Sequence, residues 1–277
     1  MSLIKDIIEC DYEELNFLIE SAIQEANSKA SKVEIIGFEN VFAKNTVFKG
    51  FIPFSTKIKY ASHNMETYNM QTKDFFYDFA KFVKDNNYKT GMEIVLVLEY
   101  FINSYFGIFK HDIREYIFNQ VAWNTSTTDE EYFAKLENNE IGDLKGQSAA
   151  MCTERAALAQ QILSLFGFEA YYCIGCIDLG YKQEPHAFNI VKRKNDYAIL
   201  DYSIPVMSYN TNNSIRNYYS FVGILSNEEF ENFINNQEVK SFNDYFYDME
   251  NKKVETDNIR NYVVGKFQID KTDNKII

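Results

Sequence analysis

Hydrophobic and polar positions follow two different periods in the N-terminal half of the chain. Apolar residues recur at the spacing of one helix face in four segments, which cover residues 5–28, 72–86, 92–105 and 112–123. From Val33 to Phe54, β-branched and aromatic runs are broken by glycine and asparagine, which predicts two or three strands. The polar, acidic stretch from Asn124 to Lys145 predicts a loop and a short helix, with Thr128 and Asp129 as candidate caps.

The second half begins with a helical segment that is apolar around most of its circumference. Such a helix lies inside a fold rather than on its surface. We expect Ser148 to cap it and Gly167 to end it. The strand-like runs that follow cover residues 170–178, 186–191, 197–201, 219–225 and 262–269, with a helix at 228–235. A helix followed by antiparallel strands predicts an α+β fold, in which this central helix packs on an antiparallel sheet.

Composition favours a single globular domain over residues 1–277. Of the 277 residues 46% are hydrophobic and 25% are charged, and proline occurs only three times, so no flexible linker is apparent. The net charge of −12 lacks the basic cluster that phosphate binding requires. We therefore expect neither nucleic acid nor an anionic membrane as a partner.

The same survey predicts a cytoplasmic location. No basic segment followed by an apolar run marks a signal peptide, and polar residues such as Glu99 interrupt the most apolar stretch, Met92–Phe109. Secretion without a classical signal stays open. The four cysteines do not form the pattern of a disulfide framework. We expect no cofactor, and the oligomeric state stays open.

Candidate chemistry gathers around Cys152, in the first turn of the central helix. The partial positive charge of a helix N-terminus favours thiolate over thiol, and the thiolate is the nucleophile. His186 begins a strand, and Asp201 ends the next one. Packing is an ordinary role for each of these residues alone, but the combination indicates a nucleophile, a base and an orienting carboxylate.

The hairpin between the two strands suggests how the last two residues meet. If the turn centres between Arg193 and Lys194, then His186 lies directly opposite Asp201. Opposed side chains have Cβ atoms about 4.5–5.5 Å apart, which allows an imidazole–carboxylate hydrogen bond.

The run from Gly146 to Gly167, GQSAAMCTERAALAQQILSLFG, is followed by Pro-His-Ala-Phe-Asn-Ile-Val and by Ala-Ile-Leu-Asp. Over about residues 140–205 this pattern resembles the transglutaminase-like superfamily of the papain-like group. The resemblance implies Cys152 as nucleophile, His186 as general base and acid, and Asp201 as the residue that orients it. It also implies a catalytic core at about 90–225, with elaborations at 1–90, as an α/β extension, and at 226–277.

The resemblance implies acyl chemistry on an amide, as in a cysteine protease, amidase or deamidase acting on a protein, a peptide or a small amide. An acyl or acetyl transferase with the same triad is an alternative, since the spacing and Cys-x-Glu are also similar to arylamine N-acetyltransferases. A crosslinking transglutaminase and a peptide-binding scaffold without turnover are further alternatives.

Four further features have two interpretations each. Gln147 is either the second oxyanion donor or a loop residue that satisfies local backbone, and Trp123 is either a wall of the cleft or a core residue. Cys173 and Cys176 form a C-x-x-C, but inside a strand they point to opposite faces, so we expect no metal or redox site there. We expect Glu154 and Arg155 to be solvent-facing or ion-paired helix residues.

Overall fold

The computed structural model describes residues 2–29, 35–37, 46–53, 57–60, 65–69, 73–107, 109, 112–113, 128–131, 145–178, 183–203 and 221–235. Its helices are α1 (Ser2–Glu9), α2 (Tyr12–Lys29), α3 (Lys73–Asp85), α4 (Gly91–Phe106), α7 (Cys152–Leu165) and α9 (Asn227–Asn235). Its strands are β1 (Ile35–Gly37), β2 (Thr46–Lys49), β3 (Lys57–Tyr60), β4 (Met65–Asn69), β5 (Ala170–Asp178), β6 (Gln183–Lys192), β7 (Tyr197–Leu200) and β8 (Phe221–Leu225).

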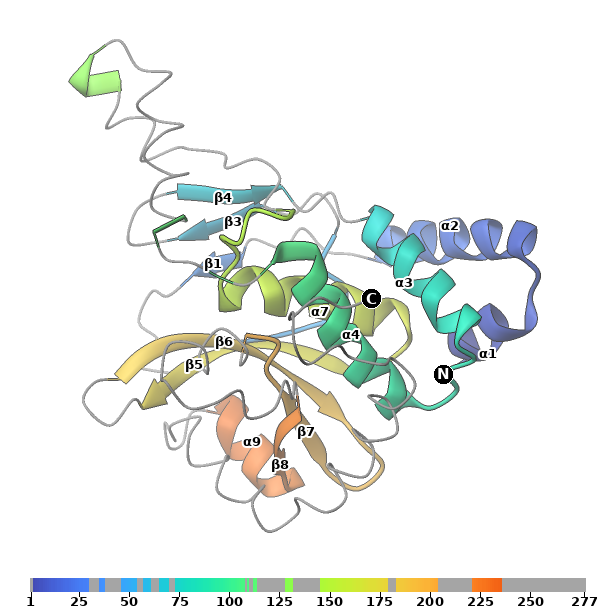
Figure 1. Cartoon of the computed structure of the whole chain (residues 1–277). Coiled ribbons are helices and arrows are strands. Elements are labelled where there is room, and N and C mark those ends of the chain that lie inside the picture. The colour runs from blue at the N-terminus through green and yellow to red at the C-terminus, as the bar shows by residue number, and fades with distance from the viewer. Residues whose placement is uncertain are drawn as a thin grey trace, which may run out of the picture.

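A five-stranded antiparallel sheet is the centre of the fold. Its strand order is β2-β5-β6-β7-β8, and every neighbouring pair is antiparallel. Helix α7 lies across one face of this sheet, and α9 lies on the other face (Figure 1). The prediction of an α+β fold is confirmed, with α7 as the helix that packs on the sheet.

The two faces of β6 show why its residues 187–191 lack a polar side. Ala187 and Val191 belong to the large core beneath α7, whereas Phe188 and Ile190 belong to a second core on the α9 face. The one polar residue among them, Asn189, donates to the Ala156 carbonyl of α7 at 3.0 Å. A strand covered on both faces reads as a continuous apolar run, because neither side is left to water.

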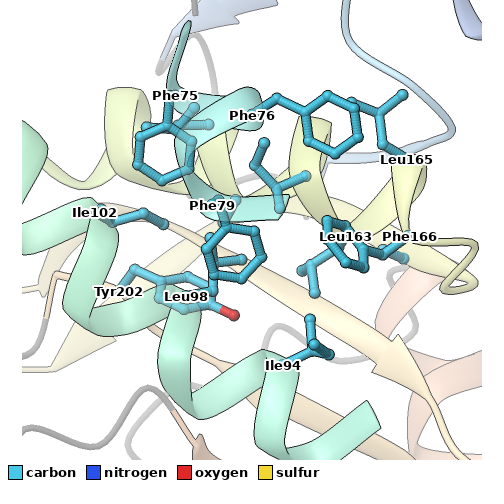
Figure 2. Packing of buried hydrophobic residues seen from close by; sticks show 14 of the residues in the cluster. Phe75, Phe76, Phe79, Ile94, Leu98, Ile102, Leu163, Leu165, Phe166 and Tyr202 are labelled. Carbon is cyan, nitrogen blue, oxygen red and sulfur yellow. The ribbon is translucent and has the colours of Figure 1, made fainter. Parts of the chain in front are cut away.

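The helices pack through aromatic side chains supplied mainly by α3. Phe75, Phe76 and Phe79 point from α3 into the space between α4 and α7 (Figure 2). The Phe79 ring meets Phe101 of α4 at 5.2 Å and Phe166, just after α7, at 5.3 Å between ring centroids, both edge to face. This geometry places the positive edge of one ring against the negative face of another, which adds to the apolar burial.

The segment before α7 is fixed on the end of α4. Gly107 follows α4 with φ of 77°, and the amide groups of Gly146 and Ser148 donate to the carbonyls of Tyr105 and Phe106, at 2.7 and 2.9 Å. The positive φ of Gly107 favours glycine, and a Cβ there would lie 2.7 Å from the Ser148 hydroxyl, which would have to turn away. The start of α7 is thereby held beside the end of α4.

Several predicted elements need correction. Ser148 does not cap the central helix: α7 begins at Cys152 after Met151, because the backbone of Ser148 is bonded to the end of α4. The predicted first helix is two helices, α1 and α2. Strands β3 and β4 were not predicted; they form a separate three-stranded sheet with β1.

Other predictions agree with the structure or lie outside it. The Thr128 hydroxyl accepts from the amide of Glu131 at 3.1 Å, as expected of a helix cap. Gly167 follows α7 with φ of 79°, as its predicted role requires. Most of the predicted helix at 112–123, with Trp123, and the predicted strand at 262–269 lie outside the described residues.

Candidate active site

Cys152 is the first residue of α7, and its side chain is buried. Met151 before it has an extended backbone, and its amide donates to the Glu154 carboxylate at 2.9 Å, which is half of a capping box. Residues in the first turn of a helix have amide groups without partners inside the helix, and these groups carry partial positive charge. The Cys152 sulfur therefore lies where the helix favours an anion.

His186 of β6 and Asp201, directly after β7, are in contact. The imidazole Nε2 and the carboxylate Oδ2 are 2.8 Å apart, and both side chains are buried. The other carboxylate oxygen, Oδ1, accepts from the backbone amide of Ser203 at 2.9 Å and from its hydroxyl. The Asp201 carboxylate is thus held on one side by the backbone and presents its second oxygen to the imidazole.

The contact was predicted, but the strand register behind it is wrong by two residues. Ile190 pairs with Ile199 and Lys192 with Tyr197, so the turn centres between Lys194 and Asn195. Continued past its last pair, Asn189 with Leu200, this register would set Ser203 opposite His186, and the Ser203 hydroxyl lies 3.4 Å from Nε2. A shift of two residues keeps each side chain on its face. Asp201 reaches the imidazole diagonally, from just beyond the end of β7.

Electrostatics favour the protonated form of His186. Burial opposes the cation and lowers the pKa, but the charges of Asp201 and Cys152, and hydrogen bonds with both, outweigh it. The pKa of His186 is therefore raised well above its usual value. The same contacts place Cys152, His186 and Asp201 in one cluster, so the structure brings together the three residues singled out in the sequence.

Two further candidates stay predictions. Gln147 lies in the exposed turn at 145–148, and none of the described hydrogen bonds involves its side chain, so its oxyanion role stays a prediction. Trp123 lies outside the described residues, and its place beside a cleft stays a prediction as well.

Two residues in the turn after Cys152 were expected to be solvent-facing or ion-paired, and the expected exposure to solvent is wrong. Glu154 and Arg155 are both fully buried. Helix periodicity places them away from the sheet, but α4 packs on that side of α7 and excludes water. Ser203 was not singled out at all; the turn after β7 brings its hydroxyl to 3.4 Å from His186 Nε2.

Within the described residues, no group of histidine, cysteine, aspartate and glutamate is arranged to hold a metal ion. Cys173 is fully buried, and burial raises the pKa of its thiol well above the usual value, which disfavours the reactive thiolate. The side chain of Cys176 is outside the described part of the chain. None of the helices described has the length and apolar character needed to cross a membrane.

Comparison with known proteins gives no relative from which a function could be transferred. No protein-family model matches the chain, and neither the curated proteins nor the solved structures contain a match.

Proposed function

We propose that the chain is a cysteine-dependent enzyme with a papain-like core of the transglutaminase-like type, acting on amide carbonyls as a protease, amidase or deamidase. The observation that carries the proposal is the position of His186. Its imidazole is hydrogen-bonded to the orienting carboxylate of Asp201 at 2.8 Å and also to Cys152 at the start of α7. A nucleophile at a helix start, a base and a residue that orients the base are the parts of a cysteine triad.

The two nitrogens of His186 have different roles in this proposal. Nε2 faces Asp201 and Ser203, so contact with the Cys152 sulfur is assigned to Nδ1. With Nε2–H donating to the carboxylate, neutral imidazole presents the lone pair of Nδ1 to the thiol. Proton transfer from the Cys152 sulfur to Nδ1 then gives a thiolate beside an imidazolium.

Acylation follows from this ion pair. The Cys152 thiolate attacks the carbonyl carbon, forming the S–C bond, and the carbonyl π pair moves to oxygen. When the C–N bond breaks, the leaving nitrogen takes the proton from Nδ1 of His186 and departs as an amine, or as ammonia from a glutamine side chain. Neutral His186 then removes a proton from water, which attacks the thioester and releases the acid and the Cys152 thiol.

The developing oxyanion would be stabilised by backbone donors at the start of α7. The Cys152 amide is in the first turn and points along the helix axis toward its N-terminus. Loss of one donor from an oxyanion hole costs about 2.7–4 kcal/mol in the barrier of other enzymes. Because water and an amine can both attack the thioester, the acceptor that reaches Cys152 decides between hydrolysis and transfer.

Selective alkylation tests the activated thiol. Iodoacetamide at neutral pH, with each cysteine peptide quantified by mass spectrometry, should label Cys152 faster than Cys10, although Cys10 is less buried. Burial raises the pKa of the Cys10 thiol, and the nearby charge of Lys84 lowers it by less. Cys10 is therefore an internal reference for a thiol without a triad. Equal alkylation rates at Cys152 and Cys10 would contradict the proposal.

Turnover is tested on a panel of peptides with free or blocked glutamine side chains, by following ammonia release and new amino termini. Cys152→Ala should abolish whichever activity appears, and Cys10→Ala should keep it. Activity that survives in Cys152→Ala would place the reaction at another site.

A further inference from the structure

Arg155, three residues after the proposed nucleophile, is fully buried, and within the described part of the chain its hydrogen-bond acceptors are uncharged. Its Nε donates to the Ala150 carbonyl at 3.1 Å, Nη1 to the Asn103 side-chain oxygen at 2.7 Å, and Nη2 to the Gly107 carbonyl at 2.5 Å. The guanidinium also lies 5.7 Å from the centroid of the Phe106 ring. Among the described residues, no carboxylate is within ion-pair distance of this buried cation.

The acceptors of Arg155 belong to the two segments that meet at the start of α7. Asn103 and Gly107 close the end of α4, and Ala150 is two residues before Cys152. A planar guanidinium has five donors in a rigid fork, so it can fix several acceptors at once. The side chain therefore joins the end of α4 to the backbone that leads into the nucleophile.

The charge of Arg155 acts on the same site. Burial lowers its pKa, while the charges of Glu154, Asp201 and Cys152 raise it, and the resulting value of about 10 keeps the guanidinium protonated at neutral pH. Interaction between charges is mutual, so the Arg155 cation attracts negative charge on Cys152 and Asp201 in turn. Burying a cation costs free energy, and among the described residues the compensation comes from neutral acceptors and the Phe106 ring.

We propose that Arg155 is a positioning residue for Cys152, which fixes the backbone ahead of the nucleophile on the end of α4 and supplies positive charge that favours the thiolate. The inference rests on the proposed function and deepens it. It assigns part of the activation of Cys152 to a residue outside the triad.

Asn103→Asp is the sharpest test, because it changes the charge and keeps the shape. The new carboxylate would accept the same hydrogen bond from Nη1 and would neutralise the guanidinium. We expect the pH midpoint of iodoacetamide alkylation at Cys152 to rise, and the rate at neutral pH to fall about tenfold, because charges on residues three apart in a helix are close neighbours. Asn16→Asp, on the exposed side of α2, is the matched control and should leave the profile unchanged.

The other ionisable groups around the site stay constant in this comparison. They are Glu154 on α7, the buried Glu99 one turn before Asn103 on α4, and the His186–Asp201 pair. Two further variants separate charge from shape. Arg155→Lys keeps the charge and should keep the pH midpoint, whereas Arg155→Gln removes it and should raise the midpoint. Thermal unfolding of each variant shows whether it is folded.

The outcomes distinguish this inference from the proposed function. If wild-type Cys152 reacts no faster than Cys10, the proposed function fails and the inference falls with it. If Cys152 is activated but Asn103→Asp has the profile of the control, only the inference is overturned. If neither Asn103→Asp nor either Arg155 variant folds, Arg155 is a folding residue and the inference is overturned as well.

Discussion

Replacing Asp201 with asparagine should do more than remove a charge, because the surroundings decide how the amide is oriented. In the wild type Oδ1 accepts from the Ser203 amide at 2.9 Å, while Oδ2 faces His186 Nε2. A backbone amide can only donate, so the oxygen of the new side chain must take the Oδ1 position. The NH₂ group then faces Nε2, which must accept rather than donate.

The size of the expected effect follows from the free energy needed to turn the new amide the other way. Turning the amide would set its NH₂ against the buried Ser203 amide, and a buried donor without an acceptor costs about 1–3 kcal/mol. That free energy corresponds to a ratio of about 5–150 in favour of the first orientation. In that orientation the proton of neutral His186 moves to Nδ1, so the Nδ1 that the proposed mechanism sets beside the thiol can no longer accept the proton of Cys152.

We therefore expect Asp201→Asn to slow alkylation of Cys152 at neutral pH by about one to two orders of magnitude. The assay is the rate of iodoacetamide labelling against pH, with ¹⁵N chemical shifts of the imidazole reporting its tautomer. Asp196→Asn is the matched control, because this carboxylate pairs with Arg193 at 2.9 Å in the turn of the same hairpin, away from the cluster. Wild-type labelling rates in Asp201→Asn would refute the reasoning.

Three further predictions concern stability. Phe79→Ala should lower the free energy of unfolding by about 3–5 kcal/mol in urea titrations, whereas Phe17→Ala, at a site 79% exposed, should change it by less than about 0.5 kcal/mol; equal effects would mean that the aromatic core is misplaced. Gly107→Ala should cost more than Gly146→Ala, since both have positive φ but only at Gly107 would a Cβ meet another atom, 2.7 Å away; the reverse order would contradict the close approach of the loop to α4. Because the pKa of His186 is raised in the folded state, its protonation should stabilise the fold fully below the unfolded-state pKa of 6.5, and this contribution should be lost as the pH rises through the folded-state pKa. If the free energy of unfolding of His186→Asn fell with pH in the same way, His186 would be excluded as the source.

The hairpin of β6 and β7 shows how far a residue pattern can be followed. Alternation of apolar positions placed His186 and Asp201 on one face and led to a contact that the structure contains. The register itself was wrong by two residues, because the turn is centred one residue later than the sequence suggested. A period of two fixes the face of a side chain, but every register that differs by two residues satisfies it equally well.

The surroundings of Cys152 show what a residue pattern cannot predict. A cysteine at the start of a helix that ends in glycine could be identified from the chain, but the partners of Arg155 could not. Asn103 is 52 residues away in sequence, and its contact with Arg155 exists only because α4 packs beside α7. The same packing turned Arg155 and Glu154 from expected surface residues into buried ones.

By itself, the sequence determined what depends on neighbours along the chain: helix and strand periods, the α+β class, the glycine stop after α7 at Gly167, and Cys152, His186 and Asp201 as candidates. Tertiary structure alone decided what depends on distant segments. It set the strand register that brings Ser203 to the imidazole, the junction of α4 with α7, and the burial of Arg155. The division has a physical cause, since local spacing records which side of an element is apolar, whereas the groups that face that side are set by packing.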